Sequence, residues 1–121
     1  MMARLIRIIG AALILGFCAF AVSLGRAPFN LLLIYLIIGA ISFFNYWRDK
    51  RAAEAGTLRV RETTMHLSDL VFGIAGGLLA QAVLLHKTAK PQFATISGAI
   101  AALHIAGLAL LILGVVDYPG V

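Results

Sequence analysis

The chain has 121 residues, enough for one domain, and 62% of them are hydrophobic whereas only 12% are charged. An average soluble domain is about 45–50% apolar and about 25% charged, and a chain of this size has too little interior to hide such an apolar excess from water. The formal net charge is +5, and its cations flank apolar runs. We therefore expect a membrane protein whose partners are anionic lipid headgroups, and no nucleic acid partner for this chain.

Four continuous apolar runs dominate the sequence, and each has about the 20 residues needed to cross roughly 30 Å of hydrocarbon. They cover residues 8–24, 29–47, 67–85 and 93–116. Because apolar and polar residues do not alternate along these runs, strands are not expected. The sequence predicts an all-α, polytopic transmembrane helical bundle of four spans that forms a single domain over residues 1–121.

The first run has the parts of a secretory signal peptide, because Arg4 and Arg7 precede it and Ala19 and Ala21 give an A-x-A pattern. We expect it to stay in the protein as an uncleaved anchor. This run also contains Cys18, the only cysteine of the chain, which therefore cannot form an intramolecular disulfide.

The one long polar stretch, residues 48–66, separates the second and third runs. Residues 48–55 are expected to continue the second helix out of the membrane, and Gly56 to end it. Just before this stretch, aromatic residues predict a belt at the level of the headgroups: Phe43, Phe44, Tyr46 and Trp47.

The distribution of cations predicts the orientation. With four spans, the N-terminus and the loop 48–66 share one side, which carries Arg4, Arg7, Arg48, Lys50, Arg51, Arg59 and Arg61. The opposite side has only Arg26, Lys87 and Lys90. The positive-inside rule therefore predicts that both termini and the loop 48–66 lie in the cytoplasm, in a bacterial cytoplasmic (inner) membrane.

The third run leaves a second arrangement open. It carries Gly73, Gly76 and Gly77 near its middle, and a re-entrant helical hairpin bending there would return His86 to the cytoplasmic face. The result would be three spans plus a hairpin, with a cleaner separation of charge. Non-helical backbone at that depth must be buried in protein, and a chain this small offers little protein to cover it. We therefore expect a straight third span.

Several short motifs follow one another along the chain: an Asp-Lys pair, an Arg-x-x-Glu turn with a nearby His, a glycine-rich span with a Gln, and a His-Lys-Thr-x-Lys-Pro-x-Phe segment. They comprise Asp49, Lys50, Arg59, Glu62, His66, Gly73, Gly76, Gln81 and residues 86–93. In these motifs and their spacing the chain resembles the family of small bacterial membrane proteins catalogued as domain of unknown function 1294, from about residue 33 to the fourth span. It departs from the family pattern at Arg61, Phe72 and Ala89, where proline, glycine and a basic residue are usual. The resemblance implies a membrane protein whose activity is unknown.

Polar residues near the ends of the runs are candidates for binding phosphate or headgroups: Asp49, Lys50, Arg59, Glu62, His66, His86, Lys87, Thr88 and Lys90. Lysine, histidine and threonine donate to phosphate oxygens, and a carboxylate can orient the cations. The structural alternatives are a topology anchor at Asp49–Lys50 and a loop-shaping ion pair of Arg59 with Glu62. Glu62 and His66, one helical turn apart, could also move protons. The histidine spacing predicts no metal site, and nothing indicates a cofactor.

Three polar residues fall inside apolar runs, and we expect each to face protein: Asp69, Gln81 and His104. Asp69 is either paired, for example with His66 three residues earlier, or reaches the interface. Gly73 and Gly77 form a G-x-x-x-G pattern with Gly76 beside them, which is typical of close helix packing in lipid.

The leading hypothesis is a non-enzymatic, self-associating membrane protein, a homo-oligomer, whose basic loops contact anionic lipid headgroups or a partner protein. A second hypothesis is a lipid- or isoprenoid-phosphate-modifying enzyme that uses Glu62, His66 or His86 as acid or base. It requires the loops around residues 48–66 and 86–91 to share a face. A third is a small four-span transporter, for which His104 is the deepest protonatable candidate.

Overall fold

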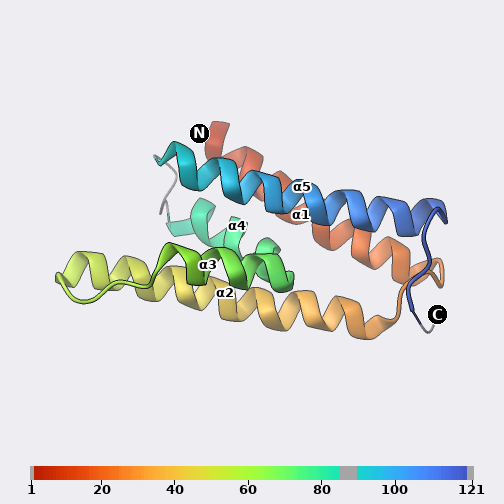
Figure 1. The fold of residues 1–121 in the computed structure, drawn as a ribbon, viewed down its shortest axis with the longest axis horizontal. Coiled ribbons are helices and arrows are strands. Elements are labelled where there is room, and N and C mark those ends of the chain that lie inside the picture. Colours follow the sequence, from red (N-terminus) through yellow and green to blue (C-terminus); the bar gives the residue numbers. More distant parts are fainter. Residues whose placement is uncertain (1, 85–89, 120–121) are drawn as a thin grey trace.

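The computed structural model describes residues 2–84 and 90–119, and every regular element within them is helical (Figure 1). In chain order the elements are α1 (Met2–Ser23), α2 (Phe29–Ala55), α3 (Glu62–Ser68), the short π-helical stretch η1 (Asp69–Gly73), α4 (Ile74–Leu84) and α5 (Pro91–Leu113). Four helical segments are long and apolar enough to cross a membrane, namely α1, α2, α5 and the segment Glu62–Leu84. The all-helical class and the four apolar segments predicted from the sequence are confirmed.

The helix boundaries fall at residues that stop or start a helix. α2 continues past its apolar run to Ala55 and ends at Gly56, whose φ of 70° is one that a residue without Cβ adopts readily. The amide of Gly56 donates to the Ala52 carbonyl and closes the last turn. Pro28 and Pro91, which lack an amide hydrogen, stand at the beginnings of α2 and α5, where no helical donor is needed.

The third apolar segment is not straight. Within η1, Val71 has φ −88° and ψ 44°, and Phe72 has φ 83° and ψ 8°, which are not helical values. Beyond this turn the chain runs back, because a Cβ added to Gly77 would lie 2.3 Å from Oδ1 of Asp69. Two residues eight apart in a straight helix are separated by about 12 Å along the axis. α3 and α4 therefore form a helical hairpin, and Figure 1 shows α4 between α2 and the pair α1 and α5, with α3 in front, alongside α2.

Both arms of the hairpin meet the same end of the bundle. α3 begins there because it follows the short loop after α2. α4 ends there because the amine of Lys50, in the last part of α2, donates to the carbonyl of Leu84 at 2.5 Å. Further in, Gly76 of α4 packs directly on Gly39 of α2. The turn at Val71 therefore points into the bundle, away from the end at which the hairpin enters.

The prediction of a straight third span was wrong, and the alternative of three spans plus a re-entrant hairpin describes the structure. The objection to a hairpin was that so small a chain could not cover it. The other helices cover the returning arm: 56% of the most apolar stretch of Glu62–Leu84 is buried, against 28%, 33% and 28% in α1, α2 and α5. The buried residues belong mainly to α4, whereas the turn residues Leu70, Val71 and Phe72 stay exposed. The bend also falls on Phe72 and not on the neighbouring glycines.

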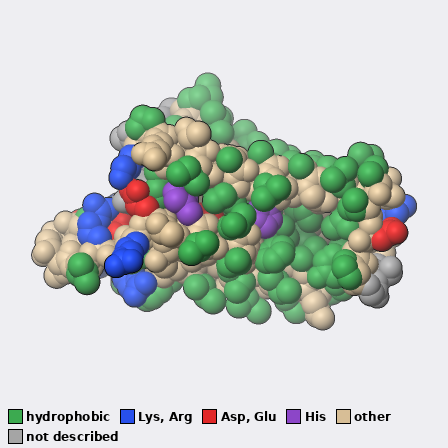
Figure 2. All heavy atoms as spheres, in the orientation of Figure 1, with side chains coloured by type: hydrophobic (Ala, Val, Ile, Leu, Met, Phe, Trp, Pro, Cys, Tyr) green, Lys and Arg blue, Asp and Glu red, His purple; other side chains and the backbone are tan. Residues whose placement is uncertain are grey.

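α1 begins and α5 ends at opposite ends of the bundle (Figure 1). Arg4 donates to the carbonyl of Ala82, near the end of α4, at 3.1 Å. Gly114, just after α5, lies against Arg26 in the α1–α2 loop. The two ends of the chain thus lie at opposite ends of the bundle, whereas the prediction that both termini share one side requires them to lie at the same end. Every described lysine and arginine except Arg26 belongs to the first turns of α1, the last part of α2, the loop 56–61 or the N-cap position of α5, and so lies at the end where α1 begins, which we call the basic end. Figure 2 shows Lys and Arg side chains gathered at this end of the visible face.

The glycines of the third segment pack within the chain. A Cβ added to Gly76 would lie 1.8 Å from the carbonyl oxygen of Gly39, and one added to Gly73 would lie 2.9 Å from the Cβ of Ser42. Any side chain at Gly76 would force α4 away from α2. These glycines thus bring the hairpin close enough to α2 for polar side chains of the two elements to meet.

The left-handed backbone conformation of Phe72 predicts that glycine is more stabilising than alanine at this position, the reverse of the order in a helix. We expect Phe72→Gly to be more stable than Phe72→Ala by about 1 kcal/mol, because only glycine adopts a positive φ without cost. Both variants lose the aromatic ring, so its contribution cancels. In a continuous helix the order is reversed, with alanine better by about 1 kcal/mol. Equilibrium unfolding in mixed detergent micelles measures the difference.

The control for this comparison is Val83, an exposed residue within α4. There Val83→Ala should be more stable than Val83→Gly. If alanine is also preferred at position 72, the hairpin turn is absent from the protein in micelles.

Candidate functional site

Hydrogen-bonded polar side chains lie inside the bundle and form what we call the inner polar cluster. They come from α1, α2, η1, α4 and α5, so that the turn and the returning arm of the hairpin and the three helices around them contribute. None of them is more than 9% exposed. The members are Arg7, Ser42, Tyr46, Asp69, Gln81 and Ser97.

The carboxylate of Asp69, at the start of η1, is fully buried. It accepts hydrogen bonds from the hydroxyl of Ser42 and, at 2.7 Å, from the hydroxyl of Tyr46. Ser42 and Tyr46 are four residues apart and so lie on one face of α2. A carboxylate in hydrocarbon is costly unless its oxygens meet donors, and α2 supplies them. Asp69 thus faces the interior of the bundle and not the membrane surface.

Gln81 of α4 connects this carboxylate to α1 and α5. Its amide nitrogen donates to the Tyr46 hydroxyl at 3.2 Å and to the Ser97 hydroxyl at 2.9 Å. Its amide oxygen accepts from Nε of Arg7 at 2.8 Å. Because Tyr46 gives its own proton to Asp69, its oxygen is free to accept from Gln81. The bonds therefore form a directed chain that joins the Arg7 guanidinium to the Asp69 carboxylate through two neutral side chains.

His104 of α5 holds the turn of the hairpin. Its Nε2 lies 3.0 Å from the carbonyl oxygen of Leu70, and since a carbonyl only accepts, Nε2 is the donor. In the neutral ring, Nδ1 then accepts from the Tyr35 hydroxyl at 2.6 Å. The Phe72 ring packs edge-on against both Tyr35 and His104, with centroids 5.2 Å and 5.5 Å away. Both nitrogens of this deep histidine are therefore used to fix the turn.

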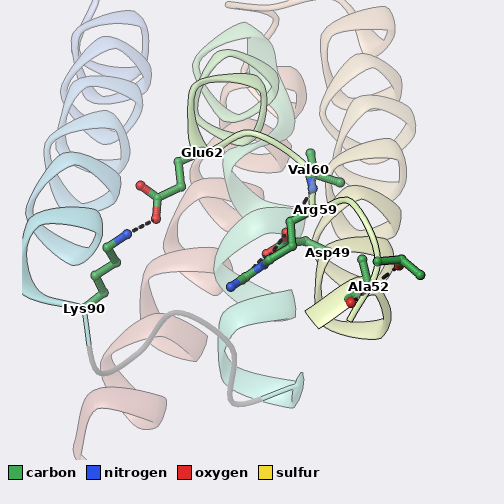
Figure 3. A network of polar contacts seen from close by, with 7 residues as sticks. Asp49, Ala52, Arg59, Val60, Glu62 and Lys90 are labelled. Carbon is green, nitrogen blue, oxygen red and sulfur yellow. Dashed lines mark hydrogen bonds and ion pairs between the residues drawn. The ribbon is translucent and has the colours of Figure 1, made fainter. Parts of the chain in front are cut away.

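At the basic end lies a second group of polar residues, which we call the outer cluster: Asp49, Lys50, Arg59, Glu62, His66 and Lys90. Figure 3 shows four of them, Asp49 with Arg59 and Glu62 with Lys90. Asp49 is fully buried. Arg59 donates to its two oxygens from Nε at 3.1 Å and from Nη2 at 2.8 Å, and the amide of Val60 donates at 3.1 Å. These bonds to Asp49 are the main cause of a raised pKa of the Arg59 guanidinium. Asp49 thereby ties the loop 56–61 to α2.

The other members of the outer cluster bridge helix ends. Lys50 caps the last carbonyl of α4, where the helix dipole favours a cation. Glu62, at the start of α3, forms an ion pair with Lys90, just before α5 (Figure 3). The His66 ring stacks on Phe93, with centroids 4.3 Å apart. The remaining candidates from the sequence lie outside the described residues: His86, Lys87 and Thr88.

The arrangement offers no evident place for a metal. Within residues 2–84 and 90–119, no three His, Cys, Asp or Glu side chains gather closely enough to hold an ion. His66 and His104 lie in different places, one at the basic end and one at the hairpin turn. Cys18 is buried in the apolar core shared by α1, α2, α4 and α5.

Sequence reasoning missed four members of the inner polar cluster: Arg7, Ser42, Tyr46 and Ser97. The predicted aromatic belt suits Phe44 and Trp47, which are 53% and 41% exposed, but Tyr46 is fully buried. A signal for the inward face of α2 was present in the spacing. Small and polar residues recur there at intervals of three and four, as Tyr35, Gly39, Ser42, Tyr46 and Asp49, and such a stripe within an apolar run indicates a face turned toward protein.

The fold and the two clusters define a small multi-pass membrane protein. Residues 39–93 match the family described as "Protein of unknown function (DUF1294)", which confirms the resemblance predicted from the sequence. The matched segment runs from Gly39, under the hairpin, to Phe93, beside His66, and so contains the whole hairpin and the outer cluster. No curated protein and no solved structure matches the chain.

The chain of hydrogen bonds predicts that its members act together in stability. Tyr46→Phe should cost about 1–3 kcal/mol, because Asp69 and Gln81 each lose a buried partner. Gln81→Leu should cost a similar amount, and the double variant should cost less than the sum by roughly 0.5–3 kcal/mol. A double-mutant cycle of unfolding in mixed micelles measures the coupling. Tyr118→Phe is the control, and additive effects at Tyr46 and Gln81 would argue against the chain.

Proposed function

We propose that the protein is a multi-pass protein of the bacterial cytoplasmic membrane whose basic end faces the cytoplasm and contacts anionic lipid headgroups. The positive-inside rule supports this orientation, because nearly all cations lie at the basic end. In it the N-terminal end of α1 and the loop 56–61 are cytoplasmic, and the end of α5 lies on the opposite side.

The lipid contact is supported by the cations of the basic end that form no ion pair. Arg59 and Lys90 form ion pairs with Asp49 and Glu62. In and after α2, three arginines are exposed and make no ion pair with any described residue, and we call them the exposed arginines: Arg48, Arg51 and Arg61. Arg4 on α1 is likewise exposed without an ion pair among the described residues. Cations next to an anionic membrane surface each contribute about 1 kcal/mol of binding. The exposed arginines therefore remain available to headgroups, whereas the paired ones hold the fold together.

Contacts with aromatic residues support a position of two of these arginines at the membrane surface. The Arg48 guanidinium lies 5.9 Å from the centroid of the Phe44 ring, and that of Arg51 lies 5.4 Å from Trp47. Exposed aromatic rings of this kind sit at the level of the headgroups. An arginine held over such a ring presents its planar fork toward phosphate oxygens at the same level.

The other two hypotheses have less support. The enzyme hypothesis requires the two polar loops to share a face, and the Glu62–Lys90 pair meets that condition. No reaction follows from it, because the carboxylates of both clusters are engaged by arginine, lysine or hydroxyl donors. The transporter hypothesis relied on His104, whose two ring nitrogens are occupied at the hairpin turn.

The topology can be tested with single cysteines in a Cys18→Ser background. We expect Thr57→Cys and Gln92→Cys to react with a membrane-impermeant maleimide only in inverted vesicles, because both lie at the basic end. Val116→Cys should react in intact cells. If position 92 reacts from the side opposite to position 57, the hairpin is wrong. If all three positions react from the reverse sides, only the orientation is wrong.

The lipid contact can be tested by capturing the purified protein from micelles that contain equal amounts of phosphatidylglycerol and phosphatidylcholine. We expect phosphatidylglycerol to be enriched among the bound lipids, and the enrichment to fall when the exposed arginines are replaced in Arg48→Gln/Arg51→Gln/Arg61→Gln. Arg26→Gln, at the opposite end, is the matched control and should leave the ratio unchanged. An unchanged ratio in the triple variant would contradict the proposal.

A further inference from the structure

We propose that a groove between α1, α4 and α5 binds one anionic phospholipid, with its phosphate at Arg7 and an acyl chain along the groove. The groove has a volume of about 430 Å³, within the range of roughly 300–1,000 Å³ found for ligand sites. Most of its wall is apolar or small, and includes Gly10, Leu13, Leu78, Gly98, Ala101 and Ile105.

The polar groups of the groove gather at the end nearer the basic end of the bundle. They are Arg7, Gln81 and Ser97, all members of the inner polar cluster. The wall beyond them, toward Leu13 and Ile105, carries no charge. The groove therefore has the polarity of an amphiphile, with a polar end near the headgroups and an apolar end in the hydrocarbon.

The guanidinium of Arg7 favours the binding of an anion at the polar end of the groove. Its side chain is only 9% exposed, and it makes no ion pair within the described chain. Two of its N–H groups are used, by Gln81 at 2.8 Å and by the Ala3 carbonyl at 2.9 Å. A guanidinium has five such groups, so three remain for a ligand. Arg4 lies one turn earlier on α1, donates to the Ala82 carbonyl of α4 and makes no ion pair among the described residues, so it adds a second positive charge on the side of Arg7 nearer the basic end.

The dimensions of the groove suit one leaflet of a bilayer. Its wall on α5 extends over residues 94–105, which corresponds to roughly 17 Å at 1.5 Å per residue. That length is about half of the 30 Å hydrocarbon core. On α1 the side of the groove is formed by Ile6, Ile9 and Leu13, which are 59%, 49% and 40% exposed. The groove is thus open to the surrounding lipid along its length, so an acyl chain can enter from the side.

This inference rests on the proposed function in one respect only, namely that anionic lipid surrounds the basic end. The two contacts use different residues. The exposed arginines of α2 and the following loop attract exchanging headgroups, whereas Arg7 holds a single lipid between three helices. The two proposals can therefore fail separately.

The test is native mass spectrometry of the intact protein, released from micelles that contain phosphatidylglycerol or phosphatidylcholine of the same chain length. We expect one phosphatidylglycerol to stay bound to each chain, and phosphatidylcholine to be retained at least about tenfold less. Arg7→Gln should reduce phosphatidylglycerol retention by a similar factor, because the phosphate loses its fork of donors. The Arg48→Gln/Arg51→Gln/Arg61→Gln variant should keep the single bound lipid even where its general enrichment is lost.

A second variant leaves the inner polar cluster intact and fills the groove instead. Gly98 has no atom near the position of an added Cβ, so Gly98→Leu should fold normally and still exclude the acyl chain. Gly107→Leu is the matched control on the same helix, because its Cβ position is equally open and lies away from the groove. Full retention by Gly98→Leu, equal retention of phosphatidylcholine, or dimers in place of the lipid adduct would each overturn the proposal.

Discussion

A turn of the chain inside hydrocarbon must find protein partners for its backbone, and this requirement organises the whole molecule. The turn at Val71 and Phe72 has no water to bond with at that depth. His104 of α5 donates to the Leu70 carbonyl and is itself held by Tyr35 of α2. Residues of α2 and α5 thus supply the hydrogen bonds that hold the turn of the re-entrant hairpin. Because the hairpin returns to the end of the bundle at which it enters, the two chain ends lie at opposite ends.

The hydrogen bonds of the inner polar cluster fix the position of the hairpin relative to α1, α2 and α5. Apolar contacts between helices are weakly specific in lipid, because lipid chains are as apolar as leucine. The directed bonds from Arg7 to Asp69 determine which faces meet, and the absence of side chains at Gly39 and Gly76 lets those faces approach closely. The outer cluster connects segments in the same way at the basic end. There Asp49 and Glu62 form ion pairs with Arg59 and Lys90, two cations for which the sequence predicted phosphate binding.

The sequence predicted the class, the helical segments and the family resemblance, because these depend on composition and local motifs. It did not predict the hairpin, since the size of the chain does not reveal which partners the backbone and side chains of the turn find in the other helices. Phe72 carries the positive φ although the bulk of its side chain disfavours it, and the neighbouring aromatic rings compensate. Tyr46 was assigned to the headgroup level because of its residue type, and only the three-dimensional contacts with Asp69 and Gln81 reveal its role.

The location of His104 on the last helix has a consequence for how the protein is made. Synthesis proceeds from the N-terminus, so α1, α2 and the hairpin sequence leave the ribosome before α5 does. During that interval the Leu70 carbonyl lacks its histidine donor and Gln81 lacks Ser97. The hydrogen bonds of the hairpin are therefore complete only after α5 has joined the bundle, and the last helix of the chain completes the fold of the segment before it.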